Sequence, residues 1–304
     1  MPQPSDSAAA ALRLPVWATA LARRSIREIN TVEATFAAGA ALAGLDAKVR
    51  AEPAFADLWR RRLALEAACA TLQAAGRPED KAGLRDAVAF TPDSSDPGPA
   101  GRAGRAWRAL ADGSRQWAEI AFGLGAPIGD EGVALIEAQF RSQAPAPIAA
   151  AVAARAVAVA LNKPAPALAF MVADAVLTAR LHWPAVLPLL APELQRSPAP
   201  RPKPGEGAWE AACCVVYARA AARACDVYAE LARAEARLRA VAPKLRAKGA
   251  SAAVAAFLAE DALTTASEIP GLSERGLRRL FDRLVSLGAV RELTGRPTFR
   301  LYGL

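Results

Sequence analysis

The last 32 residues of the chain are rich in arginine, the side chain whose planar fork of donors matches phosphate. Four arginines follow Ser273 at helical spacing and three lie beyond Gly288, against three acidic side chains in the same stretch. A guanidinium group can donate to a guanine base or to a phosphate, so this pattern predicts contacts with duplex DNA. The residues expected to make them are Ser273, Arg275, Arg278, Arg279, Arg283, Arg291 and Arg296.

A second cluster of charged side chains lies in the first half of the chain and could line a polar pocket, as an enzyme would require. Its members are Asp80, Arg85, Asp86, Asp96 and Arg102. The neighbouring run GPAGRAGR follows no predicted strand and lacks the GK[ST] ending of a phosphate-binding loop. We therefore expect no phosphate loop there and no enzymatic activity.

The chain has few histidine and cysteine residues that could bind a metal or form disulfides. The chain has one histidine, His182, and four cysteines, two of them adjacent at Cys213 and Cys214. This spacing suits neither a zinc site nor a disulfide framework, so no metal and no cofactor are expected. Asp174 lies in an apolar helical stretch, where an unpaired carboxylate would be costly, and is expected to meet a buried cation such as Arg180.

The composition sets the fold class. The chain has 304 residues, of which 79 are alanine, and a formal net charge of +8. Alanine is the strongest helix former and a poor strand former, so a mainly helical protein is expected. No stretch resembles a signal peptide or an apolar span of about 20 residues, which predicts a cytoplasmic protein without a membrane contact. The basic surplus favours a polyanionic partner, nucleic acid above all.

Residues 1–248 are expected to form an Ala-rich, multi-helix domain. Proline and glycine predict loops at 91–105 and 194–208. Arg60, Arg61 and Arg62 are consecutive on a predicted helix and so point in different directions, and one buried ion pair on a solvated face is expected from them. Helical spacing of apolar residues predicts helices over 32–45, 53–75, 80–88, 102–110, 116–123, 130–143, several Ala-rich stretches up to 181, and 209–241.

Residues 249–304 are expected to form a separate module. The apolar spacing predicts one helix from Ser251, a short second helix over 264–271 and a third helix capped by Ser273. The alternating segments VRELT and TFRLY, joined by GRP, predict a two-stranded hairpin. This order is typical of a winged helix-turn-helix, whose third helix lies in the major groove while the wing reaches the neighbouring backbone.

The final run, LSERGLRRLFDRLVSLGAVRELTGRPTFRLYGL, resembles the small winged helix that ends many Fic-family and related bacterial proteins, although nothing here resembles the Fic catalytic motif. Further blocks, among them LWRRRLALEAACATLQAAGRPEDKAGLRDA and VADAVLTARLHWPAVLPLL, are similar in order and separation to a bacterial family. This family is catalogued as domain of unknown function 1403 and is found mainly in alphaproteobacteria, often on plasmids. The resemblance implies a bacterial cytoplasmic protein and carries no catalytic residues.

Together these patterns predict a DNA-associated regulator or plasmid-maintenance factor that binds duplex DNA through its winged helix. The helical body would then provide a homodimer interface or a protein partner contact. Two alternatives remain open. One is a scaffold in a chromosome- or plasmid-segregation complex, whose winged helix binds protein. The other is an enzyme that uses the acidic and arginine pocket of the first half.

Overall fold

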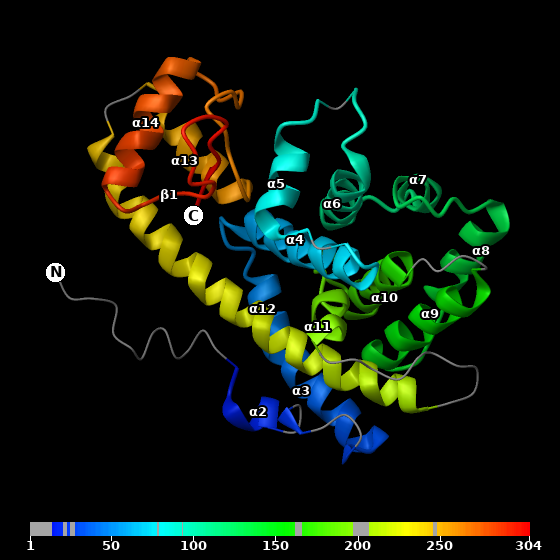
Figure 1. Ribbon diagram of the computed structural model, residues 1–304. Coiled ribbons are helices and arrows are strands. Elements are labelled where there is room, and N and C mark those ends of the chain that lie inside the picture. Colours follow the sequence, from blue (N-terminus) through cyan, green and yellow to red (C-terminus); the bar gives the residue numbers. More distant parts are fainter. Residues whose placement is uncertain are drawn as a thin grey trace.

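A computed structural model describes residues 14–20, 23–24, 28–77, 79–92, 94–161, 166–196, 207–245 and 248–304. They form a bundle of helices that ends in one small antiparallel hairpin (Figure 1). The predicted fold class, mainly α with a C-terminal two-stranded hairpin, is confirmed. In the described part of the chain, no helix combines the length and apolarity that a membrane crossing requires.

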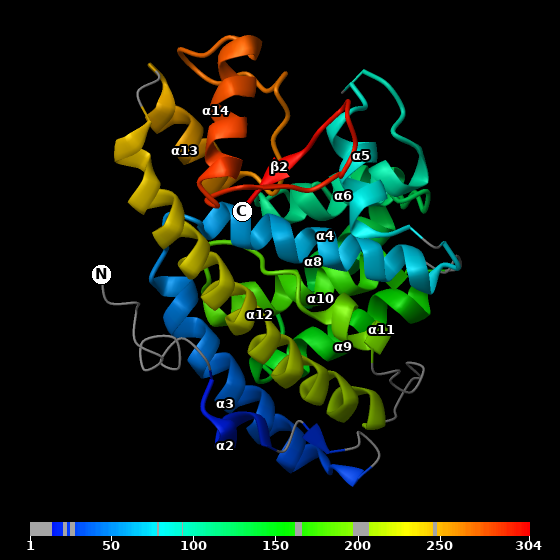
Figure 2. The same ribbon diagram turned by 60° about the vertical axis from the view of Figure 1, so that its left-hand side comes forward.

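The longest described helix, α12 (Ala208–Val241), runs diagonally across the molecule and connects the helical body to the C-terminal module (Figures 1 and 2). Helix α3 (Thr31–Arg50) packs along it, and the facing alanines allow the two backbones to approach closely. Two buried indoles tie other helices to this pair: Trp59 Nε1 donates to the carbonyl of Ala224 at 3.0 Å, and Trp209 Nε1 donates to that of Ala151 at 2.8 Å.

The remaining helices of the body surround this pair, and all of them except α2 contribute to a second core around Trp107 and Trp117. They are α2 (Val16–Ala20), α4 (Ala56–Ala74), α5 (Lys81–Ala89), α6 (Gly98–Ala111), α7 (Trp117–Gly123), α8 (Asp130–Gln139), α9 (Ala146–Ala160), α10 (Pro166–Leu181) and α11 (Leu190–Arg196).

The glycine- and arginine-rich run after residue 97 is helical, so the predicted loop at 91–105 is too long. Pro99 lies in the first turn of α6, where its missing N–H costs nothing. The glycines serve helix packing: a Cβ at Gly104 would lie 2.8 Å from Cγ2 of Val88 and 3.1 Å from Cδ1 of Leu84. They let α6 lie close against α5. The other predicted loop, 194–208, falls mostly outside the described residues.

Among the described residues Asp174 meets no cation, and the predicted partner Arg180 does not bind it. Its buried carboxylate accepts the backbone N–H groups of Leu189 and Leu190, at 2.9 and 3.3 Å, and the hydroxyl of Tyr217 at 3.2 Å. These amides lie at the start of α11, where backbone donors lack helical partners. Burial outweighs these hydrogen bonds and raises the pKa of Asp174 to about 7. His182 is exposed, whereas Cys213 and Cys214 are core residues of α12.

The C-terminal module consists of α13 (Ala250–Ala259), α14 (Glu274–Ser286), β1 (Arg291–Glu292) and β2 (Tyr302–Gly303). The strands pair in antiparallel register, and both are shorter than expected. Leu263 extends the hairpin from the other side, since its N–H and C=O each bond to Tyr302, at 2.8 and 2.9 Å. The rings of Phe257, Phe281 and Tyr302 form the centre of the module, with successive centroids 5.0 Å apart.

The second helix predicted for the module, 264–271, does not form. Thr264 and Ser267 bind backbone N–H groups locally: the Ser267 hydroxyl accepts from the N–H of Thr264 at 3.0 Å, and the Thr264 hydroxyl accepts from that of Ala266 at 3.1 Å. Such bonds compete with a helix, and Pro270 and Gly271 then stop the segment from continuing. The segment is therefore a series of turns.

The module is not set apart from the body, because one hydrophobic core includes Phe257 and Phe281 together with Leu238 of α12. Gly249, at the predicted boundary, has φ +93°, and a Cβ there would lie 2.7 Å from the carbonyl oxygen of Pro270. This glycine allows a tight turn packed against the module.

Candidate nucleic-acid interface

Helix α14 is the most strongly amphipathic part of the module. Ser273 caps it by accepting a hydrogen bond from the N–H of Gly276 at 3.2 Å. Leu277, Leu280, Phe281 and Leu284 are buried on its inner face against the rest of the module. The opposite face is exposed at the outer edge of the molecule, away from the helical body (Figure 1). Side chains on that face are free to meet a large partner.

Three of the predicted DNA-binding residues, Arg275, Arg279 and Arg283, form a row on this outer face. Their i, i+4, i+8 spacing places them on successive turns over about 12 Å. All three are exposed, and among the described residues none of their side chains forms an ion pair or hydrogen bond. We call these three the arginine row. Unneutralised guanidinium groups in a line are suited to the phosphates of a polyanion.

A groove of about 780 Å³ extends the arginine row toward the end of α12. One wall is a short 3₁₀ turn, η3 (Ala242–Lys244), and the other is α14, with Arg279 and Arg283 at its rim. Lys244 is exposed on the facing wall, and none of the described residues that line the groove is acidic. The groove therefore has one sign of charge, which concentrates anions.

Two other predicted residues of α14 have local roles. The hydroxyl of Ser273 is used in capping the helix. Arg278 donates to Glu274 one turn earlier, at 3.4 Å, with both side chains largely exposed. Such a pair is weak and can open for a partner.

The structure places Arg296 against the helical body rather than beside the arginine row. Its guanidinium donates two hydrogen bonds to Asp86 of α5, at 2.7 and 2.8 Å, and lies 5.5 Å from the ring centroid of Phe90. Phe299 packs edge-on against the same ring at 5.6 Å. The tip of the hairpin thus rests on α5, and the predicted wing contact with DNA does not agree with this placement.

Arg291 also lies apart from the arginine row. It donates to the carbonyl oxygen of Leu304 at 3.3 Å and lines a polar cavity of about 500 Å³ with Arg62, Lys81 and Arg223 of the body. Glu66, at the same cavity, accepts hydrogen bonds from Lys81 at 2.5 Å and Arg223 at 2.9 Å. The cavity therefore contains charges of both signs, unlike the groove beside α14.

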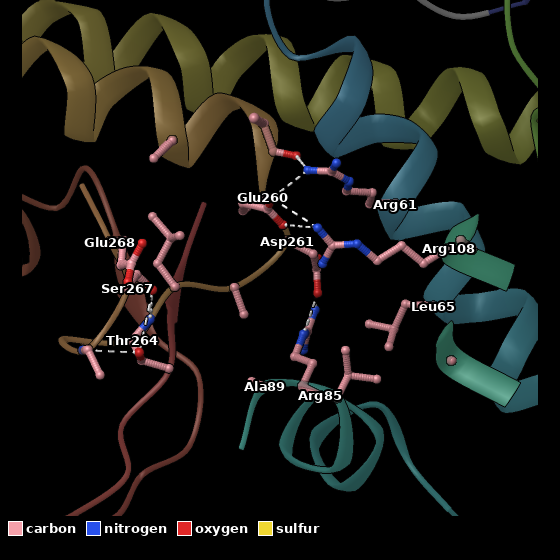
Figure 3. Close-up of a pocket in the computed structure, with 18 of the residues that line it drawn as sticks. Arg61, Leu65, Arg85, Ala89, Arg108, Glu260, Asp261, Thr264, Ser267 and Glu268 are labelled. Carbon is pink, nitrogen blue, oxygen red and sulfur yellow. Dashed lines mark hydrogen bonds and ion pairs between the residues drawn. The ribbon is translucent and has the colours of Figure 1, made fainter. Parts of the chain in front are cut away.

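An arginine clamp joins the module to the body. Two acidic residues directly after α13, Glu260 and Asp261, meet four arginines from α4, α5 and α6. Figure 3 shows three of them, Arg61, Arg85 and Arg108. The ion-pair distances are 2.6 Å from Glu260 to Arg61, 2.9 Å from Glu260 to Arg108, 2.9 Å from Asp261 to Arg62 and 2.6 Å from Asp261 to Arg85. Two members of the run 60–62 therefore form ion pairs to the module, where one buried pair was expected.

Electrostatics favour the ionised form of Asp261. Burial alone would raise the pKa of this carboxyl group, but the hydrogen bonds and charges of Arg85 and Arg62 outweigh it and hold the pKa below its ordinary value. The carboxylate is thus a permanent anion at neutral pH and holds the two guanidinium groups in place.

The arginine clamp borders a cavity of about 630 Å³ between the module and helices α4 to α6 (Figure 3). Leu65, Val88 and Ala89 form its apolar wall, and Thr264 and Ser267 face it from the module. Each carboxylate at its end is bound by two arginines, so the arrangement is suited to docking rather than to acid–base chemistry.

The polar pocket expected in the first half does not assemble. Asp80 caps α5 through the N–H of Gly83 at 2.7 Å, while Arg85 and Asp86 on the same helix bind the module. Asp96 and Arg102 form a separate, more exposed pair at 2.7 Å. The five residues are distributed over four contacts, and of the five only Arg85 lines the cavity beside the arginine clamp.

Sequence reasoning missed Glu260 and Asp261, the residues on which the body and the module converge. An acidic pair directly after a helix in an otherwise basic module was the available signal. In the described ranges, no group of three or more histidine, cysteine and acidic side chains could hold a metal ion. The structure also leaves all four cysteines buried as free thiols.

Comparison with curated proteins gives no match to this chain. The sequence profile of one family matches residues 3–304, which is nearly the whole chain and includes both the helical body and the C-terminal module. The chain therefore belongs to this family, described as Protein of unknown function (DUF1403).

Proposed function

We propose that this chain binds duplex DNA through the outer face of α14, with the arginine row as the principal phosphate contact. The observation that carries the proposal is that Arg275, Arg279 and Arg283 are aligned, exposed and without an ion pair among the described residues. Most described arginines at the contact between the module and the body are neutralised by carboxylates, whereas the arginine row is not.

The shape of the module supports the same function. An amphipathic helix that is fixed by an aromatic core and exposed along one side can enter the major groove, which is about 12 Å wide. Lys244 adds a cation across the groove from α14, in reach of a neighbouring phosphate. The hairpin tip does not take part, because Arg296 and Phe299 pack on α5. In this respect the proposed contact differs from a winged helix that uses its wing.

The proposed setting is the cytoplasm of a bacterium, in regulation of DNA or in plasmid maintenance. Bacterial origin and a link to plasmids are what the family resemblance implies. Four buried, unoxidised thiols agree with a reducing compartment, where disulfides are rare. The helical body would provide partner contacts while α14 contacts DNA.

The test is a salt titration of duplex binding by the full chain, followed by fluorescence anisotropy with duplexes of mixed sequence. In the variant with Arg275→Ala, Arg279→Ala and Arg283→Ala, we expect affinity to fall by at least about tenfold, and the slope of log K against log salt to shrink by about 0.9 for each lost phosphate contact. The matched control removes three arginines of the body at a distance from α14, with Arg102→Ala, Arg115→Ala and Arg141→Ala.

Equal binding by the wild type and the α14 variant would overturn the proposal. An equal loss in the control variant would show that only net charge matters, and would overturn the assignment to α14. Recovery of a stoichiometric acidic protein that needs the arginine row, together with no DNA affinity at low salt, would favour the scaffold alternative instead.

A further inference from the structure

The cavity beside the arginine clamp is large enough for a small organic molecule. Its volume of about 630 Å³ is typical of ligand pockets, and it lies where the body meets the module, a common place for such pockets. The space exists because many of its lining residues are small, namely six alanines and Gly104. Ala89 and Gly104 belong to the body, and Ala256 and Ala266 to the module. The module therefore meets the body without filling the space between them.

The walls of this cavity leave apolar surface uncovered. Leu65 of α4 and Val88 of α5 line it and are only half-buried, although they lie at the contact between body and module. Figure 3 shows Leu65 across the space from Thr264 and Ser267 of the module. An apolar group placed between these two sides would remove surface of both from water, which is favourable.

The charged groups at the cavity leave one carboxylate without a partner. The three arginines that line it are each bound by a carboxylate of the arginine clamp. Glu268 also lines the cavity and is exposed, and its side chain forms no ion pair or hydrogen bond with any described residue. An anionic ligand would have to displace a carboxylate from the clamp, whereas a cationic ligand would complete a pair with Glu268.

We propose that this cavity binds a small organic cation, whose primary ammonium group pairs with Glu268 and whose apolar part lies against Leu65 and Val88. An ammonium group has three donors, so it needs further acceptors. Ser267 lies beside Glu268 in the cavity wall (Figure 3). Its hydroxyl accepts from the N–H of Thr264 and can donate to the Thr264 hydroxyl at 3.4 Å, which leaves a lone pair for the ammonium group.

A molecule bound here would also hold the turn segment 264–271 in place. This segment leads directly to Ser273, the cap of α14, and its side-chain hydrogen bonds are local ones made by Thr264 and Ser267. The ligand would contact both this segment and helices α4 and α5 of the body. It would thus join the module to the body at a second place beside the arginine clamp, and would slow local opening of the segment.

The first test compares three molecules of similar shape and different charge on the full chain. At neutral pH, 2-phenylethylamine is a cation, 2-phenylethanol is neutral and 3-phenylpropionate is an anion. We expect the amine to bind with a dissociation constant on the order of 1 mM, and at least about threefold more tightly than the alcohol or the anion. Saturation-transfer NMR measures the three affinities. Hydrogen exchange should slow in residues 264–271 when the amine is bound.

Two pairs of variants locate the site. Glu268→Gln should reduce the affinity for the amine to that for the alcohol, whereas Glu119→Gln, the same change at an exposed position of α7, should not. Ala89→Phe places a ring in the cavity and should abolish binding, whereas Ala82→Phe, on the same helix but not among the lining residues, should not. Both alanines are exposed, so neither variant should unfold, and thermal unfolding checks this.

Three results would overturn the proposal. Equal affinity for the three molecules would show an apolar contact without selection by charge. Tighter binding of 3-phenylpropionate would show that the arginines of the clamp select the ligand instead of Glu268. A dissociation constant for the amine above about 10 mM, or one that Ala89→Phe leaves unchanged, would show that this cavity takes no such ligand. None of these measurements involves DNA, so the cavity and the proposed function are tested separately.

Discussion

The carboxylate of Asp86 accepts two hydrogen bonds from the guanidinium group of Arg296, although 210 positions separate the two residues in the chain. This bidentate pair fixes the tip of the hairpin to α5, and the edge-on contact of Phe299 with Phe90 supports it. An arginine that sequence reasoning assigned to DNA therefore binds the protein itself. Whether Arg296 contacts DNA or attaches the hairpin to α5 can be tested by mutation.

We expect Arg296→Ala to lower the free energy of unfolding by about 1 kcal/mol, because the pair is partly exposed and solvent screens it. DNA affinity should change by less than about twofold. Urea unfolding and anisotropy titration measure the two quantities. The exchanged variant with Asp86→Arg and Arg296→Asp should regain part of the stability. A large loss of DNA affinity with unchanged stability would show that Arg296 contacts DNA directly.

Asp261→Ala should loosen the module, because it leaves Arg62 and Arg85 half-buried without their carboxylate. Removal of one partner from a buried ion pair typically costs about 3 kcal/mol. Hydrogen exchange should increase throughout residues 249–304 and leave the contact of α3 with α12 protected. Asp282→Ala is the matched control, since it removes an exposed carboxylate of the same module. Unchanged exchange in Asp261→Ala would contradict the role of the arginine clamp.

The carboxylate of Asp261 should make the stability of the protein depend on pH in the acid range. The pKa of Asp261 is lower in the folded protein than in the unfolded chain, so its contribution is complete above the ordinary carboxyl pKa of about 4 and is lost as the pH falls through the folded value. Chemical unfolding at decreasing pH should therefore show a weaker dependence in Asp261→Asn than in the wild type. Parallel curves for the two proteins would contradict this assignment.

For Asp174 we expect the opposite dependence of stability on pH. Its folded pKa of about 7 lies above that of the unfolded chain, so the folded state binds the proton more tightly and stability falls as the pH rises between about 4 and about 7. Asp174→Asn should remove this dependence and be more stable than the wild type at mildly alkaline pH. Asp174→Ala, which leaves the amides of Leu189 and Leu190 without an acceptor, should be destabilised at every pH. Thermal unfolding across this range measures both variants.

Lys244 should contribute to DNA binding through the groove beside α14. Charge reversal in Lys244→Glu is expected to weaken binding more than Lys244→Ala does, because a carboxylate there would repel the phosphates that Arg279 and Arg283 attract. Arg141→Glu, an equal charge reversal at an exposed position after α8, is the control. An equal loss of DNA affinity in Lys244→Glu and Arg141→Glu would show that only the net charge of the protein matters.

Helices that are specified by residues close together in the sequence could be predicted. The spacing of Leu277, Leu280, Phe281 and Leu284 predicts α14, and the cap at Ser273 marks its start. The exposed arginine row follows from the same periodicity. The second helix of the module could not be predicted correctly, because the side-chain bonds of Thr264 and Ser267 that replace it depend on the conformation of the turn.

The arginine clamp and the pair of Asp86 with Arg296 were beyond prediction for a different reason. Each joins segments that are 150 to 210 positions apart, and charge alone does not say which carboxylate an arginine will meet. The surroundings of Asp174 depended on α11, a short helix that the sequence pattern did not indicate. Because that helix was not predicted, the backbone N–H groups at its start could not be predicted as the partners of Asp174.

Helix α12 sets a length scale for the whole molecule. Its 34 residues correspond to about 50 Å of unbroken helix, which joins the packing surface of α3 to the turn beside α14. Because this helix is unbroken, it holds the arginine row of α14 at a fixed distance from the surface of α3. DNA bound to the row and a partner bound to the body would therefore be kept apart by a length that this one helix sets.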